Sequence, residues 1–198
     1  YVGTFHAICA RLLRRYHDAA GLERSFVIYD DSDQRAVMNR VLKELELDEK
    51  RFPPRQLLSR IHKQTQEGKG PADFQPEGFF DEPIKKCFEA YQRHLQAASA
   101  VDFDDILLHV LRIVEDPESL PGEEIRRRFR YVLVDEFQDV NQVQYRLVRA
   151  FASQPPHNLC VVGDDDQSIY GWRGADVRIV RGFRKDFPGA EIVKLEQN

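Results

Sequence analysis

Tyr131-Val132-Leu133-Val134-Asp135-Glu136-Phe137-Gln138-Asp139 is the stretch that decides the fold. Its first four residues are apolar, without polar residues in alternation, which predicts a strand buried on both faces, as in a parallel sheet covered by helices. In open α/β sheets ligands bind beyond the carboxyl ends of the strands. Asp135 and Glu136 therefore stand where they could hold Mg²⁺ on a nucleotide and orient a water. Taken alone, a motif of five residues is more typical of an ordinary acidic turn after a core strand than of such a nucleotide site.

A second stretch of the same kind favours the nucleotide site over the ordinary acidic turn. Leu159-Cys160-Val161-Val162-Gly163 predicts another buried strand, and it runs directly into a long polar loop that begins with three aspartates. The first motif, DEFQD (135–139), and the second, GDDDQSIYGWRGAD (163–176), resemble motifs II and III of superfamily one DNA helicases of the UvrD/Rep/PcrA type. The second motif is long enough to be highly specific.

The resemblance implies a site for hydrolysis of ATP, in which a metal bridges phosphate oxygens and a base aims the attacking water. It implies that Asp135, together with Glu136, binds Mg²⁺ and that Glu136 is the general base. Gln167 matches the residue that senses the γ-phosphate, since a neutral amide can donate to phosphate and accept from water. The supporting nucleotide network implied by the resemblance comprises Gln138, Asp139, Asp164 and Arg173.

The resemblance also implies a DNA-binding side. Tyr170 and Trp172 lie in the second motif, where an aromatic ring can stack on an unpaired base of any sequence. Thr4, Phe5 and His6 match a DNA-contacting motif of the family, at a helix N-terminus that suits a phosphate. From the residues alone, Thr4 fits a helix cap and His6 a surface position, and a lone Trp is more often part of a core or an interface.

Strands that alternate with helices predict an α/β fold with a parallel sheet flanked by helices. The resemblance implies a RecA-like P-loop NTPase core from residues 1–20 and 101–198, without its P-loop strand, and an inserted all-helical subdomain from residues 21–100. Residues 21–100 fit a plain helical bundle equally well. Residues 1–4 and 192–195 are expected to belong to strands. Expected helix caps are Thr4, Asp31 with Gln34, Asp102 and Asn141.

Composition excludes several classes of protein. Among the 198 residues 42% are hydrophobic and 31% are charged, which is typical of a soluble globular protein. No apolar run reaches the roughly 18 residues of a membrane span, and no signal peptide is visible, so a cytoplasmic protein without membrane contact is expected. Three widely spaced cysteines in apolar surroundings predict buried thiols. The cysteines and histidines do not have the spacing of a zinc site, so no zinc is expected. The net charge of −4 gives no global support for DNA binding.

The sequence contains no G-x-x-x-x-G-K-[ST] loop, which supplies the phosphate cradle of P-loop enzymes. The resemblance therefore implies a piece of a 3′-to-5′ DNA helicase of repair or replication, inactive alone, whose partners are single-stranded DNA, duplex junctions and the rest of its polypeptide. One alternative is a non-enzymatic module that binds single strands or a protein, although Asp135, Glu136 and Gln167 together count against it. Another is the motor part of a RecB/AddA-type helicase-nuclease. Without the P-loop strand one edge of the sheet is open, and an open edge can pair with a strand of another chain, so self-association is one expectation.

Overall fold

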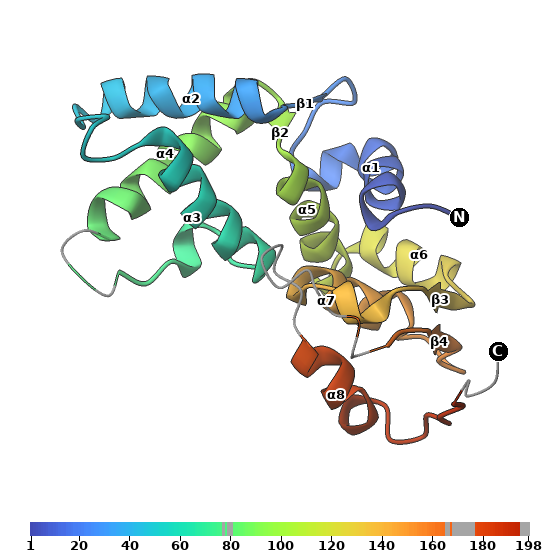
Figure 1. Ribbon diagram of the computed structural model, residues 1–198. Coiled ribbons are helices and arrows are strands. Elements are labelled where there is room, and N and C mark those ends of the chain that lie inside the picture. The colour runs from blue at the N-terminus through green and yellow to red at the C-terminus, as the bar shows by residue number, and fades with distance from the viewer. Residues whose placement is uncertain (77, 79–80, 165–166, 168–176, 195–198) are drawn as a thin grey trace.

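A computed structural model describes residues 1–76, 78, 81–164, 167 and 177–194. The fold is mixed α/β but mostly helical, and in the described residues it holds two small parallel sheets, β1–β2 and β3–β4 (Figure 1). None of the described helices is long and apolar enough to cross a membrane. The α-helices are α1 (Phe5–Arg15), α2 (Asp31–Glu44), α3 (Pro54–Gln66), α4 (Asp81–Ala97), α5 (Phe103–Glu115), α6 (Leu120–Arg128), α7 (Gln142–Phe151) and α8 (Val177–Asp186).

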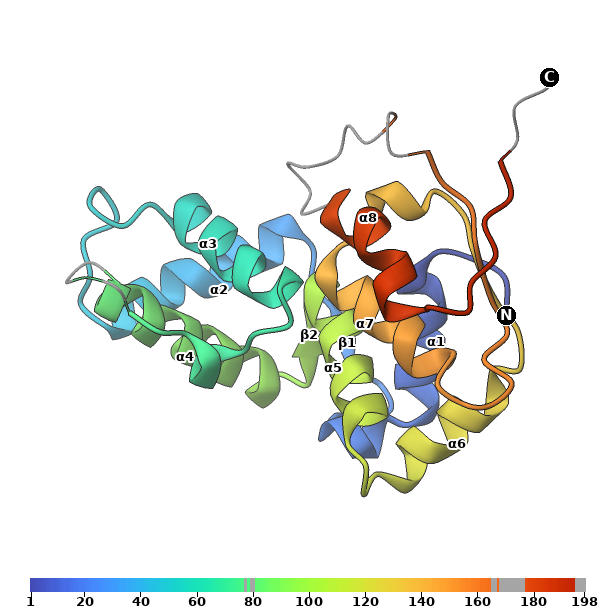
Figure 2. The ribbon, with the colours of Figure 1, turned by 90° about the horizontal axis from the view of Figure 1, so that it is seen from below.

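Helices α2, α3 and α4 pack together around a core of their own. Met38, Leu42, Ile61, Phe88 and Tyr91 are almost completely buried there and belong to one apolar cluster. Both ribbon views show these helices on one side of the molecule, with β1 (Val27–Ile28) and β2 (Ala100–Val101) between them and the other helices (Figures 1 and 2). The two strands pair in parallel, so the chain leaves and returns at neighbouring positions.

Helix α5 is the centre of the second core. It packs against α1, α6 and α7, and eight of its thirteen residues are buried. This burial explains why eight of its thirteen residues are apolar and cover a wide face of the helix, while its polar residues gather on the other side. The predicted caps of three helices are confirmed: Thr4 accepts a hydrogen bond from the Ala7 amide, Asp102 from the Asp105 amide and Asn141 from the Gln144 amide.

The third core lies under the sheet formed by β3 (Val132–Val134) and β4 (Leu159–Val161). The strands are parallel, as predicted, and Leu133 is the register partner of Cys160. Val134 and Val161 face α7, α8 and the short 3₁₀ helix η3 (Phe137–Asp139), with which they form one apolar cluster. Two further 3₁₀ turns are η1 (His17–Ala20) and η2 (Pro71–Asp73).

The prediction that both strands are buried on two faces is wrong for the described residues. Leu133 is 77% exposed and Val162 is 52% exposed, and Cys160 is exposed as well. The physical reason is that α7, α8 and η3 cover one face of the sheet, whereas no described segment covers the other. Cys9 and Cys87 are buried, as predicted.

Three local expectations are also corrected. Residues 1–4 and 192–194 are not in strands, because no neighbouring strand pairs with them among the described residues, and residue 195 of the second predicted strand lies outside that part of the chain. Helix α2 begins one residue earlier than predicted: its capping box is formed by Asp30 and Asp33, each of which accepts a hydrogen bond from the other's backbone amide. An acid at either position would suit the helix end, so the sequence pattern alone leaves this ambiguity.

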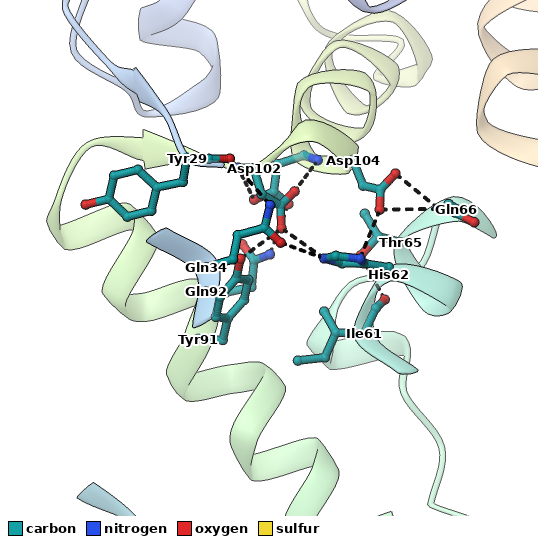
Figure 3. Close-up of polar contacts among 11 residues, drawn as sticks. Tyr29, Gln34, Ile61, His62, Thr65, Gln66, Tyr91, Gln92, Asp102 and Asp104 are labelled. Carbon is teal, nitrogen blue, oxygen red and sulfur yellow. Dashed lines mark hydrogen bonds and ion pairs between the residues drawn. The ribbon is translucent and has the colours of Figure 1, made fainter. Parts of the chain in front are cut away.

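A polar network joins α2, α3 and α4 to the start of α5 (Figure 3). His62 of α3 lies 2.9 Å from Gln34 Oε1, and its Nε2 is 3.9 Å from Asp102 Oδ2. Its Nδ1 lies 4.0 Å from Asp104 Oδ2, which also accepts from Gln66 Nε2. The network thus connects the two cores through side chains that are far apart in sequence.

Burial perturbs the acids at this junction. Asp105 accepts a hydrogen bond from Gln92 Nε2 over 3.0 Å, and the pKa of its carboxyl is raised to about 8 by burial and by the neighbouring Asp102. The pKa of Asp104 is raised to about 6, again chiefly by burial, although His62 opposes the shift. A neutral carboxyl avoids the cost of burying a charge, which explains the direction of both shifts.

Candidate functional site

Asp135 and Glu136 follow β3 directly and are both exposed at its carboxyl end. Asp135 Oδ1 accepts a hydrogen bond from the Glu136 amide over 2.9 Å, which orients the Asp135 carboxylate. Glu136 adopts a left-handed backbone conformation, with φ of 51° and ψ of 44°. Such a conformation is uncommon for a residue with a side chain, and it turns the chain sharply from the strand into η3.

Phe137 anchors the turn that carries these acids. Its ring is 1% exposed and packs edge-on against Phe183 of α8 at 5.5 Å and against Tyr145 of α7 at 6.1 Å. Its amide donates to the Val162 carbonyl over 2.9 Å, so hydrogen bonding between the two strands continues past the end of β3. The position of Glu136 is therefore set by a buried ring and by the sheet.

Four of the predicted site residues form one chain of hydrogen bonds. Gln138 Nε2 donates to Glu136 Oε2 over 2.6 Å, and Gln138 Oε1 accepts from the Asp164 amide over 3.1 Å. Gln167 Nε2 in turn donates to Asp164 Oδ2 over 2.7 Å. The carboxyl end of β3 and the loop after β4 are thus linked from Glu136 to Gln167.

The pair Asp135 and Glu136 fits Mg²⁺ chemically. Mg²⁺ prefers oxygen ligands, keeps several waters and is commonly held by one or two carboxylates together with phosphate oxygens of the substrate. The described residues contain no cluster of three or more His, Cys, Asp or Glu side chains able to hold a metal ion. Two exposed carboxylates at a strand end suit a metal that arrives with a nucleotide better than a metal held by protein ligands alone.

Asp139, the last residue of the first motif, faces a different surface. Its Oδ1 is buried without a hydrogen-bond partner among the described residues, and burial together with Glu136 raises the pKa of its carboxyl. The residue lines a groove of about 1170 Å³ between α3 and the start of α5, where His6 and Phe103 also lie. DEFQD therefore touches both the candidate nucleotide site and this groove.

The groove combines aromatic and basic side chains. The rings of His6 and Phe103 lie 4.4 Å apart, and Phe103 is 56% exposed. Burial lowers the pKa of His6, which favours its neutral form. The opposite wall is helical and includes three basic residues of α3, namely Arg55, Arg60 and Lys63.

The sequence of this chain matches that of known DNA helicases. Residues 1–188 match the family model described as the UvrD/REP helicase N-terminal domain. The chain belongs to this family. It is 44% identical over 201 residues to proteins named ATP-dependent DNA helicase PcrA from Staphylococcus aureus strains Mu50 and NCTC 8325, and equally to the one from Staphylococcus epidermidis strain ATCC 12228. All of this chain is aligned, but it spans only 27% of the length of each of these relatives.

In this member of the UvrD/REP family, the structure brings some predicted site residues together and separates others. Glu136, Gln138, Asp164 and Gln167 share one network, and Asp135 adjoins it. Tyr170, Trp172 and Arg173, which were also predicted to belong to the site, lie outside the described residues.

The three residues predicted near the N-terminus point in different directions. The Thr4 hydroxyl caps α1, and Phe5 packs against two of the apolar clusters. His6 lines the groove beside Phe103. Of the three, His6 is therefore the side chain best placed to meet a ligand in the groove.

Sequence reasoning missed Phe103 and His62 as members of this region. The stretch 102–105 reads as a helix cap, and Asp102 does cap α5, but the adjoining Phe103 is an exposed aromatic in the first helical position. That placement was a usable signal, because a large apolar side chain in an otherwise acidic first turn has no capping role. Nothing in the sequence around His62 indicated its contacts, since they come from other helices.

Proposed function

We propose that this chain supplies the motif II and motif III part of an ATP-dependent DNA helicase, which couples ATP hydrolysis to 3′-to-5′ translocation on single-stranded DNA and to duplex unwinding. The observation that carries the proposal is the hydrogen-bonded path from Glu136 to Gln167 across two parallel strands. Membership of the UvrD/REP family and the names of the aligned relatives support it. The activity is that of a longer polypeptide that includes this chain.

The roles of the site residues follow from their chemistry. Asp135 and Glu136 would hold Mg²⁺, which neutralises charge on the phosphate oxygens when it is bound with ATP. Glu136 takes the proton of the attacking water, and a carboxylate on a rigid strand end is well held for that task. Gln167 contacts the γ-phosphate through its amide. Gln138, Asp139, Asp164 and Arg173 belong to the surrounding nucleotide network.

DNA lies on the other side of the same motifs in this proposal. Tyr170 and Trp172 stack on unpaired bases, and Thr4, Phe5 and His6 contribute to the DNA-binding surface. Asp139 lines the groove that contains His6, although it is only three residues from Glu136. A short segment that borders both surfaces gives a physical route by which nucleotide state changes the grip on DNA.

We assign residues 1–20 and 101–198 to a RecA-like core and residues 21–100 to an inserted helical subdomain. The separate apolar clusters of α2–α4 and of α1, α5 and α7 support this division. The uncovered face of β3 and β4 supports contact with the rest of the polypeptide or, in its absence, self-association. Duplex junctions as substrates, a role in DNA repair or replication and a cytoplasmic location complete the proposal.

The test is DNA-stimulated ATP hydrolysis and unwinding by the full-length protein that contains this chain, compared with its Glu136→Gln variant. The parent is expected to hydrolyse ATP faster with single-stranded DNA and to unwind a duplex that has a 3′ tail. The variant keeps nucleotide and DNA binding but loses turnover, because an amide cannot accept the proton. DNA binding by the parent without any hydrolysis would contradict the proposal and favour a binding module.

A further inference from the structure

Gln138 is the one buried side chain in the path between the two acidic motifs, among the described residues. It is 2% exposed, whereas Glu136, Asp164 and Gln167 are exposed. Both ends of its amide are used: Nε2 donates to the Glu136 carboxylate over 2.6 Å and Oε1 accepts from the Asp164 amide over 3.1 Å. Gln138 therefore links an acid after β3 to the backbone after β4.

The backbone around Gln138 is closely fitted to this link. A Cβ atom at Gly163 would lie 2.6 Å from Gln138 Oε1 and 3.2 Å from the backbone nitrogens of both Phe137 and Gln138. Real Cβ atoms essentially never approach another atom so closely as the first of these distances. The end of β4 can lie against η3 only because residue 163 has no side chain.

Glu136 itself needs such support. Its left-handed backbone, with φ of 51°, is a strained conformation that persists only when the surroundings determine it. Phe137 fixes the chain on one side of it, and Gln138 holds its side chain on the other. A carboxylate on an exposed turn would otherwise sample several rotamers, because exposed side chains change rotamer within nanoseconds.

We propose that Gln138 is a positioning residue for hydrolysis: it holds the Glu136 carboxylate in register with Asp164, and through Asp164 with Gln167. This inference rests on the proposed function and adds to it a role for a side chain that is buried behind the exposed acids. Only a neutral amide suits the position, since it donates at one end and accepts at the other. A glutamate could not donate to Glu136, and a methionine of similar size could do neither.

The arrangement also couples two elements. The Asp164 amide belongs to the loop that leads to Gln167, so displacement of this loop changes the hydrogen bond to Gln138 and thereby the orientation of Glu136. The orientation of the Glu136 carboxylate therefore depends on the position of the Asp164 backbone. This coupling makes hydrolysis depend on the second motif through Gln138 as well as through Gln167.

The experiment compares four forms of the full-length protein: the parent, Gln138→Met, Glu136→Gln and the double variant. A misplacement of about 1 Å can cost about 100-fold in rate. Gln138→Met is therefore expected to lower kcat about 100-fold, while the KM for ATP stays within about threefold because no substrate contact is lost. Gln96→Met makes the same chemical change at an exposed position of α4, and this matched control should behave like the parent.

The double variant separates positioning from a general structural effect. If Gln138 acts only through Glu136, adding Gln138→Met to Glu136→Gln does not slow the residual single-turnover hydrolysis of the Glu136→Gln variant any further, because effects of residues that act as a unit are not additive. A further slowing by the full factor of the single Gln138→Met change would overturn the inference. So would a Gln138→Met variant with the kcat of the parent, or one whose loss is confined to nucleotide affinity.

Gly163→Ala provides an independent test if Gln138→Met fails to fold. The added methyl group displaces Gln138 Oε1 but keeps the amide, so the same loss of kcat at nearly constant KM is expected. Unchanged kcat in that variant would contradict the inference. If the parent itself shows no DNA-stimulated hydrolysis, both the proposed function and this inference are wrong. If the parent is active and the Gln138→Met and Gly163→Ala variants match it, only the inference is wrong.

Discussion

The Tyr91 hydroxyl donates a hydrogen bond to Asp102 Oδ2 over 3.1 Å, and both side chains are almost completely buried. Tyr91 belongs to α4 and Asp102 caps α5, so this bond ties the helical bundle to the start of the central helix. Asp102 also approaches His62 in the same network (Figure 3). The junction between the two cores therefore depends on buried polar groups that satisfy one another.

Tyr91→Phe is expected to destabilise the protein by about 1–3 kcal/mol, because it leaves a buried carboxylate oxygen short of a hydrogen-bond donor. The free energy of unfolding from urea titration measures the effect. Tyr131→Phe is the matched control, since Tyr131 is 72% exposed and should change stability by less than about 0.5 kcal/mol. Equal unfolding midpoints for the two variants would mean that the Tyr91 bond contributes nothing.

Asp105→Asn is expected to flatten the dependence of stability on pH. Burial and Asp102 raise the pKa of Asp105 from 3.8 to about 8 in the folded protein. Between these values the folded state binds more protons than the unfolded state, so Asp105 makes stability fall as pH rises, with a slope of at most about 1.4 kcal/mol per pH unit. Asparagine resembles the neutral carboxyl and removes this contribution.

Urea titrations of Asp105→Asn and its parent at pH 5, 6 and 7.5 measure that slope. The parent should lose more stability than the variant between pH 5 and 7.5. His109 has a pKa lowered to about 4 by burial and Arg112, and it acts in the opposite direction below pH 6.5, but it is present in both proteins and cancels in the difference. Parallel pH curves for the two proteins would show that Asp105 does not titrate as described.

Two glycines in helices should respond in opposite directions to alanine. In Gly122→Ala the new Cβ would lie 2.1 Å from the Ile113 carbonyl oxygen, which is backbone and cannot move aside, so a loss of more than about 2 kcal/mol is expected. In Gly182→Ala the methyl group meets nothing within 4 Å, and stability should rise by about 0.5–1 kcal/mol through helix propensity. Thermal unfolding followed by circular dichroism compares them. A stable Gly122→Ala protein would place α6 farther from α5 than described.

In the folded 198-residue chain by itself, one of the three cysteines should react rapidly with a thiol reagent such as dithionitrobenzoate. Burial raises the pKa of Cys9 to about 12 and that of Cys87 to about 11, so neither forms the reactive thiolate near neutral pH. Cys160 is exposed on the uncovered face of β4. One equivalent of thiol is expected before denaturation and three after it, and Cys160→Ala should abolish the rapid phase. Rapid labelling of two thiols would indicate that one core opens readily.

The local features of this fold could be read from the sequence. Helix periodicity located α1, α5 and α7, and Thr4, Asp102 and Asn141 were identified as caps because a capping side chain bonds to an amide only two or three residues away. The alternation of strands with helices predicted a parallel sheet, and β3 and β4 pair in parallel. These are short-range properties, so they appear directly in the order of residues.

Burial could not be read in the same way. An apolar run such as 131–134 shows that a strand is able to face a core on both sides, but it contains no information on which segments cover it. Leu133 proved 77% exposed because α7, α8 and η3 lie on the other face of the sheet. Cys160 was misjudged for the same reason, as its register partner is Leu133.

The sequence by itself determined the chemical inventory of this protein and its family: an Asp-Glu pair after one strand, a Gln after a second, and the motifs that set the chain within the UvrD/REP helicases. Tertiary structure alone decided that Gln138 joins Glu136 to Asp164, that His62 meets Asp102 and Asp104, and that His6 lies beside Phe103. The physical reason is that residue type and spacing specify what a side chain can donate, accept or bury. Contacts between residues tens of positions apart arise only when helices and strands pack and bring their faces together.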